Sequence, residues 1–263
     1  MMEFANRGTP LTEDGLTQVI TTLEINRAAF WAVLQVESSG FGFLPDRRPK
    51  ILFERHIFHR ESQGRFSKAF PDISNPQHGG YSRGASEYER LQRAIALDRE
   101  AALKSASWGI AQIMGFNYAI VGFTCVEDMV QRMVEGGEDR QIMAMAKFIQ
   151  HNQLVDALRQ DDWPRFARGY NGANYARNRY DEKLADAYAK AQRAEPSLEL
   201  RTAQAALLYL GFDPGPIDGI QGTRTRTALR DFQTRNRLQE TGELDGTSRT
   251  TLMAAAFPPA IGA

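Results

Sequence analysis

The sequence feature that most constrains the fold is a long stretch of apolar residues at helical spacing, from Leu16 to Glu37, which stops at the small residues Ser38-Ser39-Gly40. Asn26, in the middle of this stretch, is a residue type that caps helices, so the stretch can hold two helices. The first part of the chain is therefore expected to contain helices that pack one face against a core. The apolar positions that recur every three or four residues are Val19, Ile20, Leu23, Ala29, Phe30, Val33 and Leu34.

Similar patterns continue along the chain. They predict a helix over residues 87–104, one or two helices over 126–159 with the break at Gly136-Gly137, and another helix over 181–194. A short run over residues 50–54 is the candidate strand. Residues 66–86 are rich in Gly, Pro, Ser and Asn and predict a long surface loop. The expected class is mainly α, with at most a small sheet.

The sequence Ala194-Glu195-Pro196-Ser197 is the best candidate for a domain boundary, which gives domains over residues 1–194 and 198–263. The second part contains helical patterns from Leu200 and from Thr223, and then a second turn-helix unit. Its turns echo each other, because Pro216-Ile217-Asp218-Gly219 resembles Glu243-Leu244-Asp245-Gly246. A small domain of three short helices is the expected result.

Charge and cysteine content exclude several classes of protein. Lys and Arg together number 32, as do Asp and Glu, and the residues after Ser197 hold seven of each sign. This balance does not favour a nucleic-acid partner or an anionic membrane. Cys125 is the single cysteine, so no intrachain disulfide is expected, and we expect its thiol to be buried rather than nucleophilic. No stretch approaches the roughly 20 apolar residues that span a bilayer.

Three motifs occur in a fixed order: Val36-Glu37-Ser38-Ser39-Gly40, then a segment from Ser107 to Gly115, then Tyr170-Asn171-Gly172. This order resembles that of the lysozyme-like enzymes. Together with Lys50-Ile51-Leu52-Phe53-Glu54, the motifs are similar to the N-acetylmuramidase domain of modular phage endolysins over about residues 10–192. The resemblance implies an α+β lysozyme-like domain that hydrolyses the β-1,4 bond between N-acetylmuramic acid and N-acetylglucosamine in peptidoglycan, causing lysis of the host cell.

The second part resembles the three-helix peptidoglycan-binding domain of bacterial and phage proteins. The resemblance rests on Tyr209-Leu210-Gly211-Phe212, Pro216-Ile217-Asp218-Gly219, Gly222-Thr223-Arg224-Thr225, Asp231-Phe232-Gln233 and Thr241-Gly242-Glu243-Leu244-Asp245. It implies wall contacts from Asp218, Gly219, Thr223, Arg224 and Thr225. Taken singly, Asp218, Asp245 and Phe232 are better explained by turns and core packing.

Glycosidic cleavage needs an acid that protonates the leaving oxygen. Glu37 follows an apolar run and is expected near a helix C-terminus, where burial and the helix dipole both favour its protonated form. The resemblance assigns the catalytic acid to Glu37. Without the other motifs, an exposed glutamate in a surface ion pair would be the simpler interpretation.

Glu54 is the candidate for the second carboxylate, which would stabilise the developing cation or activate water. An ion pair with Arg55 or another arginine is an equally good interpretation of this residue. Asp46 and Asp72 are weaker candidates for the same task. The separation between the two carboxylates, which distinguishes retaining from inverting chemistry, cannot be read from a sequence.

The remaining motif residues are expected to line the substrate site. Ser107 and Gln112 would hydrogen-bond sugar substituents, while Gly109 would let the backbone approach closely. Trp108 would stack on a sugar or belong to the core. Tyr170 and Asn171, followed by Gly172, would orient Glu37 or the N-acetyl groups.

No cofactor or metal is expected. His56, His59, His78 and His151 lack the spacing of a zinc hydrolase. The expected partner is peptidoglycan, with no membrane insertion, and the protein is expected to be a monomer. The N-terminal residues lack the pattern of a signal peptide, so synthesis in the host cytoplasm followed by release to the wall is expected.

Two other functions stay open. The first is lytic transglycosylation of the same bond, although Ile110-Ala111-Gln112-Ile113-Met114-Gly115 departs from the usual Gly-Leu-Met-Gln-Val-Met-Pro of those enzymes. The second is a non-catalytic protein that binds the wall or forms part of a virion.

Overall fold

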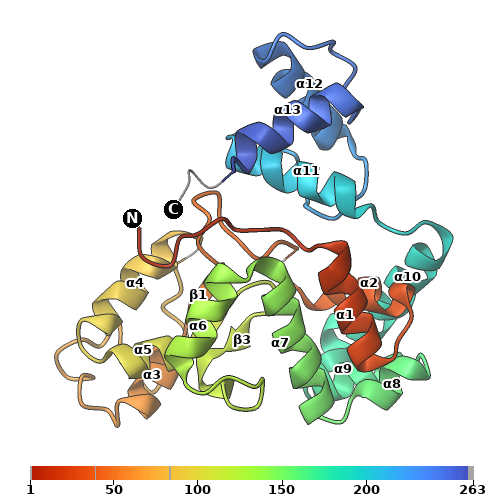
Figure 1. Ribbon diagram of the computed structural model, residues 1–263. Helices are drawn as coiled ribbons and strands as arrows, with labels where there is room; N and C mark the ends of the chain where they lie inside the picture. Colours follow the sequence, from red (N-terminus) through yellow and green to blue (C-terminus); the bar gives the residue numbers. More distant parts are fainter. Residues whose placement is uncertain (1, 39, 83, 260–263) are drawn as a thin grey trace.

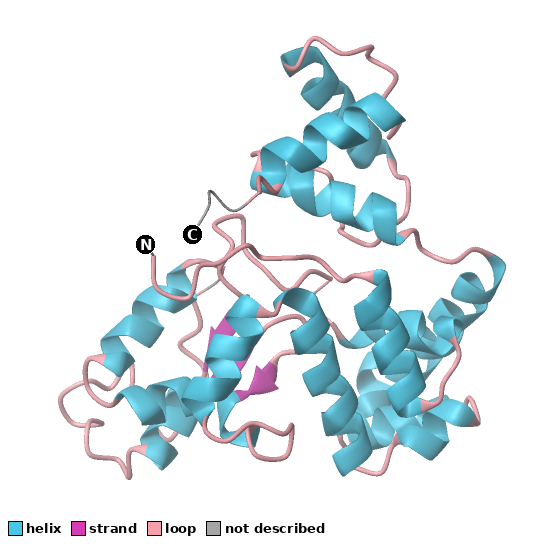
Figure 2. Ribbon diagram, viewed as in Figure 1, coloured by secondary structure: helices cyan, strands magenta, loops and turns pink. Residues whose placement is uncertain are grey.

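The computed structural model describes residues 2–38, 40–82 and 84–259. Its larger part is mainly helical, and a small sheet lies among the helices (Figures 1 and 2). The helices are α1 (Glu13–Leu23), α2 (Arg27–Glu37), α3 (Arg55–Glu61), α4 (Ser86–Ile95), α5 (Arg99–Lys104), α6 (Val126–Glu135), α7 (Gly137–His151), α8 (Val155–Arg159), α9 (Trp163–Asn171) and α10 (Tyr180–Arg193), with 3₁₀ turns at Gly115–Asn117 and Tyr175–Asn178. The strands are β1 (Ile51–Phe53), β2 (Ala106–Trp108) and β3 (Ile113–Met114). The predicted class, mainly α with a small sheet, is confirmed.

The predicted helical stretch that ends at Glu37 consists of two helices. Thr12 caps α1 by accepting a hydrogen bond from the amide of Gly15 at 3.0 Å, and Asn26 caps α2 by accepting one from the amide of Ala29 at 2.8 Å. Helix α2 ends at Glu37, as the sequence predicts, and α10 packs along it. The end of α2 is therefore supported by a helix from the far end of this part of the chain.

The sheet is antiparallel, in the order β1-β2-β3. Ile51 pairs with Trp108 and Phe53 with Ala106, so the predicted short strand is present. Strands β2 and β3 form a hairpin in which Ser107 pairs with Met114. A single connection joins α2, whose last residue is Glu37, to β1, which Glu54 follows directly.

Several local predictions need correction. Residues 87–104 form two helices because Asp98 caps α5, accepting a hydrogen bond from the amide of Ala101 at 3.0 Å. Residues 126–159 form three helices, although the predicted break at Gly136-Gly137 does separate α6 from α7. Helices α3 and α9 are additional. Cys125 is exposed, and its sulfur accepts a hydrogen bond from the amide of Asp128 at 3.4 Å, so the prediction that it is buried is wrong.

The second part consists of α11 (Leu198–Tyr209), α12 (Thr223–Arg235) and α13 (Gly246–Ala256), which confirms the three predicted helices (Figure 1). Their shared core includes Leu207, Leu229, Phe232 and Leu252. Phe232 is thus a core residue.

Two buried glutamines explain the repeated turns of the second part. Gln204 accepts hydrogen bonds from the amides of Asp218 and Gly219, at 3.0 and 2.8 Å. In the second turn, Gln233 accepts a hydrogen bond from the amide of Gly242 at 2.8 Å. Each turn is therefore held by a glutamine of the helix that precedes it.

The two parts are docked against each other through a buried ion pair. Arg201 of α11 forms a two-pronged contact with Glu138 of α7; their side chains are 1 % and 0 % exposed. Glu138 also accepts hydrogen bonds from the amides of Leu11 and Gly42, at 2.9 and 2.8 Å. Its carboxylate therefore joins three segments of the first part and one helix of the second.

Apolar and polar contacts surround this ion pair. Phe41 and Phe43 of the first part form one buried cluster with Ala205 and Ile217 of the second. The hydroxyl of Tyr209 donates a hydrogen bond to the carbonyl of Gly8 at 2.6 Å. The second part is thus fixed to the first by burial as well as by charge.

Among the described residues, no helix combines the length and the apolar character that crossing a membrane requires.

Candidate active site

Glu37 is the last residue of α2, and its side chain is half-buried. Burial raises the pKa of its carboxyl group, while the hydrogen bond from Asn171 and the nearby charge of Lys183 act in the opposite direction. Burial is the largest of these effects, because it removes water from the charged form. Both sequence expectations, a helix-end position and partial desolvation, are present in the structure.

Asn171 holds this carboxyl group from a helix that the sequence did not predict. Asn171 is the last residue of α9. Its Nδ2 donates a hydrogen bond to Oε2 of Glu37 at 2.7 Å, and the two residues are 134 positions apart in the sequence. The other carboxyl oxygen of Glu37, Oε1, is buried and has no hydrogen-bond partner among the described residues. The two oxygens therefore differ, since one is held by the amide and the other is buried without a hydrogen-bond partner among the described residues.

Tyr170 and Gly172 complete the third motif. The ring of Tyr170 stacks on Phe166 with centroids 5.5 Å apart, and burial together with the charge of Glu37 raises the pKa of its phenol. Tyr170 thus lies near Glu37 with its hydroxyl protonated. Gly172 ends α9 at a φ of +82°, a conformation that favours glycine. The third motif therefore lies at the end of a helix.

Glu54 follows β1 directly and precedes α3. Its carboxylate accepts hydrogen bonds from the hydroxyl of Tyr81, at 3.3 Å to Oε1 and 3.0 Å to Oε2. Arg55 points elsewhere and donates to the carbonyls of Gln77 and His78, at 3.0 and 2.9 Å. No arginine pairs with Glu54 in the part of the chain that the structure describes, so the interpretation of this residue as the partner of an arginine does not hold.

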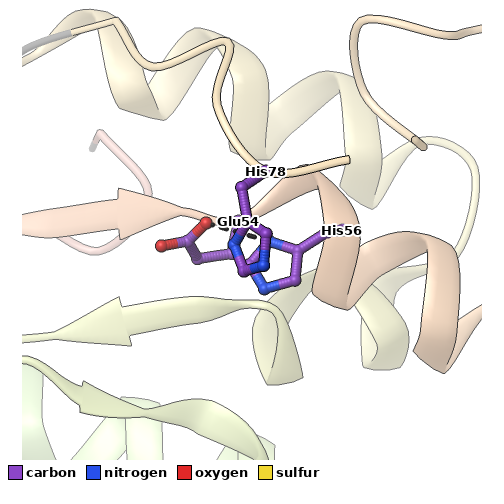
Figure 3. A group of neighbouring side chains, drawn as sticks. All are labelled: Glu54, His56 and His78. Carbon is purple, nitrogen blue, oxygen red and sulfur yellow. Dashed lines mark ion pairs between the residues drawn. The ribbon is translucent and has the colours of Figure 1, made fainter. Parts of the chain in front are cut away.

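Two histidines lie beside Glu54 (Figure 3). Nδ1 of His56 is 3.2 Å from Oε2 of Glu54, and the rings of His56 and His78 have centroids 3.7 Å apart. Burial lowers the pKa of His56, with Glu54 acting in the opposite direction. His78 comes from the loop before α4 and is exposed. Sequence spacing gave no sign of this grouping, because 22 positions of chain separate the two histidines.

The alternative second carboxylates are engaged in ion pairs. Asp46 is held by Arg48, with the closest contact at 2.6 Å. Asp72 pairs with Arg93 at 2.6 Å, and the hydrogen bond from that arginine lowers the pKa of Asp72. Each aspartate is thus paired with an arginine, whereas the carboxylate of Glu54 faces a phenol and an imidazole.

The hairpin β2–β3 uses most of its predicted sugar-binding groups internally. The hydroxyl of Ser107 donates to Oε1 of Gln112 at 2.8 Å, and Nε2 of Gln112 donates to the carbonyls of Lys50 and Gly109, at 3.2 and 2.7 Å. These bonds use every side-chain proton that either residue can donate. Ser107 and Gln112 thus position the hairpin, and only acceptor atoms remain for a sugar.

Trp108 is fully buried, and its indole nitrogen donates to the carbonyl of Leu103 at 3.1 Å. A sugar cannot stack on this ring, so the structure contradicts a substrate-binding role for Trp108 and supports the core alternative. Gly109, at a φ of +72°, is needed for a different reason: an added Cβ would meet the side chain of Gln141 at 2.5 Å. The close approach predicted here is made by Gln141, a buried residue of α7 that also accepts a hydrogen bond from the amide of Ile110 at 2.8 Å.

The predicted wall-binding residues of the second part fall into two groups. The first group is structural: Gly219 lies buried against Ser197, and Thr225 is buried and donates to the carbonyl of Pro214 at 2.8 Å. Asp218 belongs to the same structural group, because its carboxylate accepts a hydrogen bond from the amide of Ile220 at 2.9 Å.

The second group consists of Thr223 and Arg224, which are exposed at the start of α12. Arg224 pairs with Asp213 on the surface. Thr223 and Arg224 are thus the exposed members of the predicted set, whereas Asp218 is partly buried.

Comparison with known proteins agrees with this arrangement. Residues 26–192 match the family model of N-acetylmuramidases, and residues 197–252 match that of a putative peptidoglycan-binding domain. Among solved structures, the crystal structure of Burkholderia AP3 phage endolysin matches with 40% sequence identity and a TM-score of 0.66, over 70% of this chain and 72% of that one. A search of curated proteins returned no match. The chain therefore belongs to the N-acetylmuramidase family and carries a peptidoglycan-binding domain after its muramidase domain.

Proposed function

We propose that this protein is an endolysin that hydrolyses the β-1,4 bond between N-acetylmuramic acid and N-acetylglucosamine, with Glu37 as the general acid. The observation that supports this most strongly is the contact between Asn171 and Glu37, because it joins the first and third motifs around a half-buried carboxyl group. Family membership supplies the substrate class. The similar phage protein supports a role in lysis of the host cell.

The contacts of Glu37 indicate which of its oxygens carries the proton. Oε2 accepts the amide hydrogen of Asn171, so in the protonated form of Glu37 the proton would reside on Oε1, the buried oxygen without a partner among the described residues. Because Oε1 is covered in this structure, the carboxyl group would rotate to present this proton to the leaving glycosidic oxygen as the bond breaks. Burial keeps the group protonated at a pH above its ordinary range. Lys183 lies close enough to stabilise the carboxylate that remains after transfer.

Glu54 would act on the charge that develops on the sugar ring. Its ionised carboxylate would stabilise the oxocarbenium-like transition state or activate the attacking water. Tyr81 holds both carboxylate oxygens and so fixes the orientation of the group. Tyr81 is an addition to the predicted site, since its position in a loop of small residues gave no signal in the sequence.

The second domain, with its boundary proposed between residues 194 and 198, would hold the enzyme on peptidoglycan. Its candidate contacts are Thr223 and Arg224, the predicted residues with exposed side chains. We propose that the protein acts as a monomer, since each chain supplies both carboxylates and its own wall-binding domain.

Mass spectrometry of fragments released from purified peptidoglycan tests the reaction after borohydride reduction. The proposal predicts reducible N-acetylmuramic acid ends. Anhydro ends would instead identify a lytic transglycosylase, and reducible N-acetylglucosamine ends would refute the choice of bond. No fragments from the folded protein would favour a wall-binding protein without activity.

The Glu37→Gln variant tests the catalytic assignment. It keeps the size of the side chain and removes the proton that Glu37 donates, so cleavage should fall by at least about 10²-fold. Binding to intact wall should be unchanged. Full activity in this variant would refute the role of Glu37.

A further inference from the structure

We propose that Glu54, His56 and His78 form a binding site for a divalent transition-metal cation of the Zn²⁺ type, and that its occupation inhibits the enzyme. The three side chains come from two separate segments, with Glu54 and His56 at the start of α3 and His78 in the loop that precedes α4 (Figure 3). The binding site stands on geometry alone, and the inhibition rests on the function proposed above for Glu54.

The donor atoms determine which cation the site would bind. Two imidazole nitrogens and one carboxylate oxygen form a ligand set that suits Zn²⁺ and leaves a fourth position open. Ca²⁺ and Mg²⁺ prefer sites built from oxygen atoms, so both are poor candidates for this site. The chemistry therefore favours Zn²⁺ and its neighbours in the transition series.

The spacing of these atoms is close to that of a bound tetrahedral metal. One ligand atom from each residue lies within 4.8 Å of the other two, and Nδ1 of His56 is 3.2 Å from Oε2 of Glu54. Metal–ligand distances of about 2.1 Å place neighbouring ligand atoms about 3.4 Å apart. The pair formed by His56 and Glu54 already meets this spacing, and even the widest separation allowed would need to close by only about 1.4 Å.

The remaining adjustment can come from His78. Its side chain is exposed and is followed by Gly79-Gly80, so the ring can rotate without disturbing a packed core. The backbone is held at the same time, because the guanidinium of Arg55 donates to the carbonyls of Gln77 and His78, at 3.0 and 2.9 Å. The loop therefore keeps His78 beside α3 while its imidazole remains free to turn.

Metal binding would remove Glu54 from the reaction. A carboxylate that coordinates Zn²⁺ has its charge neutralised, and it would lose part of the hydrogen bonding that Tyr81 now provides. Glu54 could then neither stabilise a cationic sugar nor activate water. Zn²⁺ is thus expected to act as an inhibitor that a chelator reverses.

Calorimetric titration of the untagged full-length protein with ZnCl₂ tests the site. The expected result is one site per chain, with affinity lowered at least about tenfold in His78→Asn, since even loss of an outer-shell partner weakens metal sites by about 10- to 100-fold. His151→Asn is the matched control, because His151 is also exposed but lies in α7, outside the cluster. Equal Zn²⁺ affinity in the wild type and His78→Asn, or no binding at all, would overturn the site.

Wall-clearing assays with and without Zn²⁺ test the inhibition. We expect Zn²⁺ to inhibit the wild type and His151→Asn, with activity restored by chelator, and His78→Asn to stay active at the same Zn²⁺ concentration. A wild type that binds one Zn²⁺ and keeps full activity would overturn the inhibition. If the protein proves inactive on peptidoglycan under all conditions, the proposed function fails, while the titration still decides the metal site.

Discussion

Replacing Arg201 by Met should destabilise the protein and uncouple its two domains. The substitution removes the guanidinium but keeps an apolar side chain of similar length, so little cavity is created. It leaves Glu138, 0 % exposed, without the arginine that contacts both of its oxygens. Losing one partner of a buried ion pair costs about 3–5 kcal/mol.

The structure indicates the lower end of that range. Glu138 keeps its hydrogen bonds from the amides of Leu11 and Gly42, and the charge of Lys50 still attracts it. We therefore expect a loss of about 3 kcal/mol, equivalent to a melting temperature lower by roughly 6–12 °C for a chain of this size. Glu138→Gln in the Arg201→Met background should recover part of this loss, because it removes the stranded charge.

Two spectroscopic signals separate the domains in the assay. The three tryptophans lie at positions 31, 108 and 163, so their fluorescence reports on the first domain, whereas far-ultraviolet circular dichroism reports on helices of both. During thermal unfolding of the wild type, the fluorescence and dichroism transitions should occur at the same temperature. In Arg201→Met the dichroism should begin to change at a lower temperature than the fluorescence. Arg249→Met is the control, because the Arg249–Glu199 pair is exposed and worth little. A loss below about 1 kcal/mol in Arg201→Met, with coincident transitions, would refute the reasoning.

Three further predictions concern the site, the core and the second domain. Asn171→Leu removes a hydrogen bond that lowers the pKa of Glu37, so that pKa should rise further. If Glu37 is the general acid, as proposed, its protonated form is the active one, and the alkaline limb of the pH–activity profile should move to higher pH. A shift to lower pH would contradict this. Trp108→Ala should cost about 3–5 kcal/mol of unfolding free energy as a large cavity forms; unchanged chemical denaturation would show that the ring is not in the core. Deleting residues 198–263 should weaken sedimentation with purified wall. It should also lower the melting temperature, because Phe41 and Phe43 lose their apolar partners. A truncated protein of full stability would show that the interface between the domains does not contribute to stability.

The sequence predicted those features that depend on neighbouring residues. The apolar spacing and the cap at Asn26 were enough to place α1 and α2, and they put Glu37 at a helix end. The β-branched and aromatic run before Glu54 was enough to place β1. In both cases a local pattern determines the element, and the element determines where the carboxylate stands.

Contacts between distant segments could not be predicted in the same way. The neighbours of Glu54 include His78 and Tyr81, which a turn-rich loop brings back to α3. Trp108 looked equally suited to a sugar or to the core, because only the tertiary structure determines which face of β2 is covered. The prediction that another group approaches Gly109 closely was correct, but that group is the side chain of Gln141 from α7 rather than a ligand.

The buried Arg201–Glu138 contact also bears on how the enzyme travels over its substrate. A domain on a flexible linker samples many separations, so one attachment could serve cuts at many places along a glycan strand. Here the proposed wall-binding residues and the proposed acid belong to one rigid unit, so each attachment point offers a single reach and a single approach direction. After a cut, the whole molecule must release the wall and land again before the next bond comes within range. Cleavage should therefore be scattered over the sacculus rather than progress along one strand.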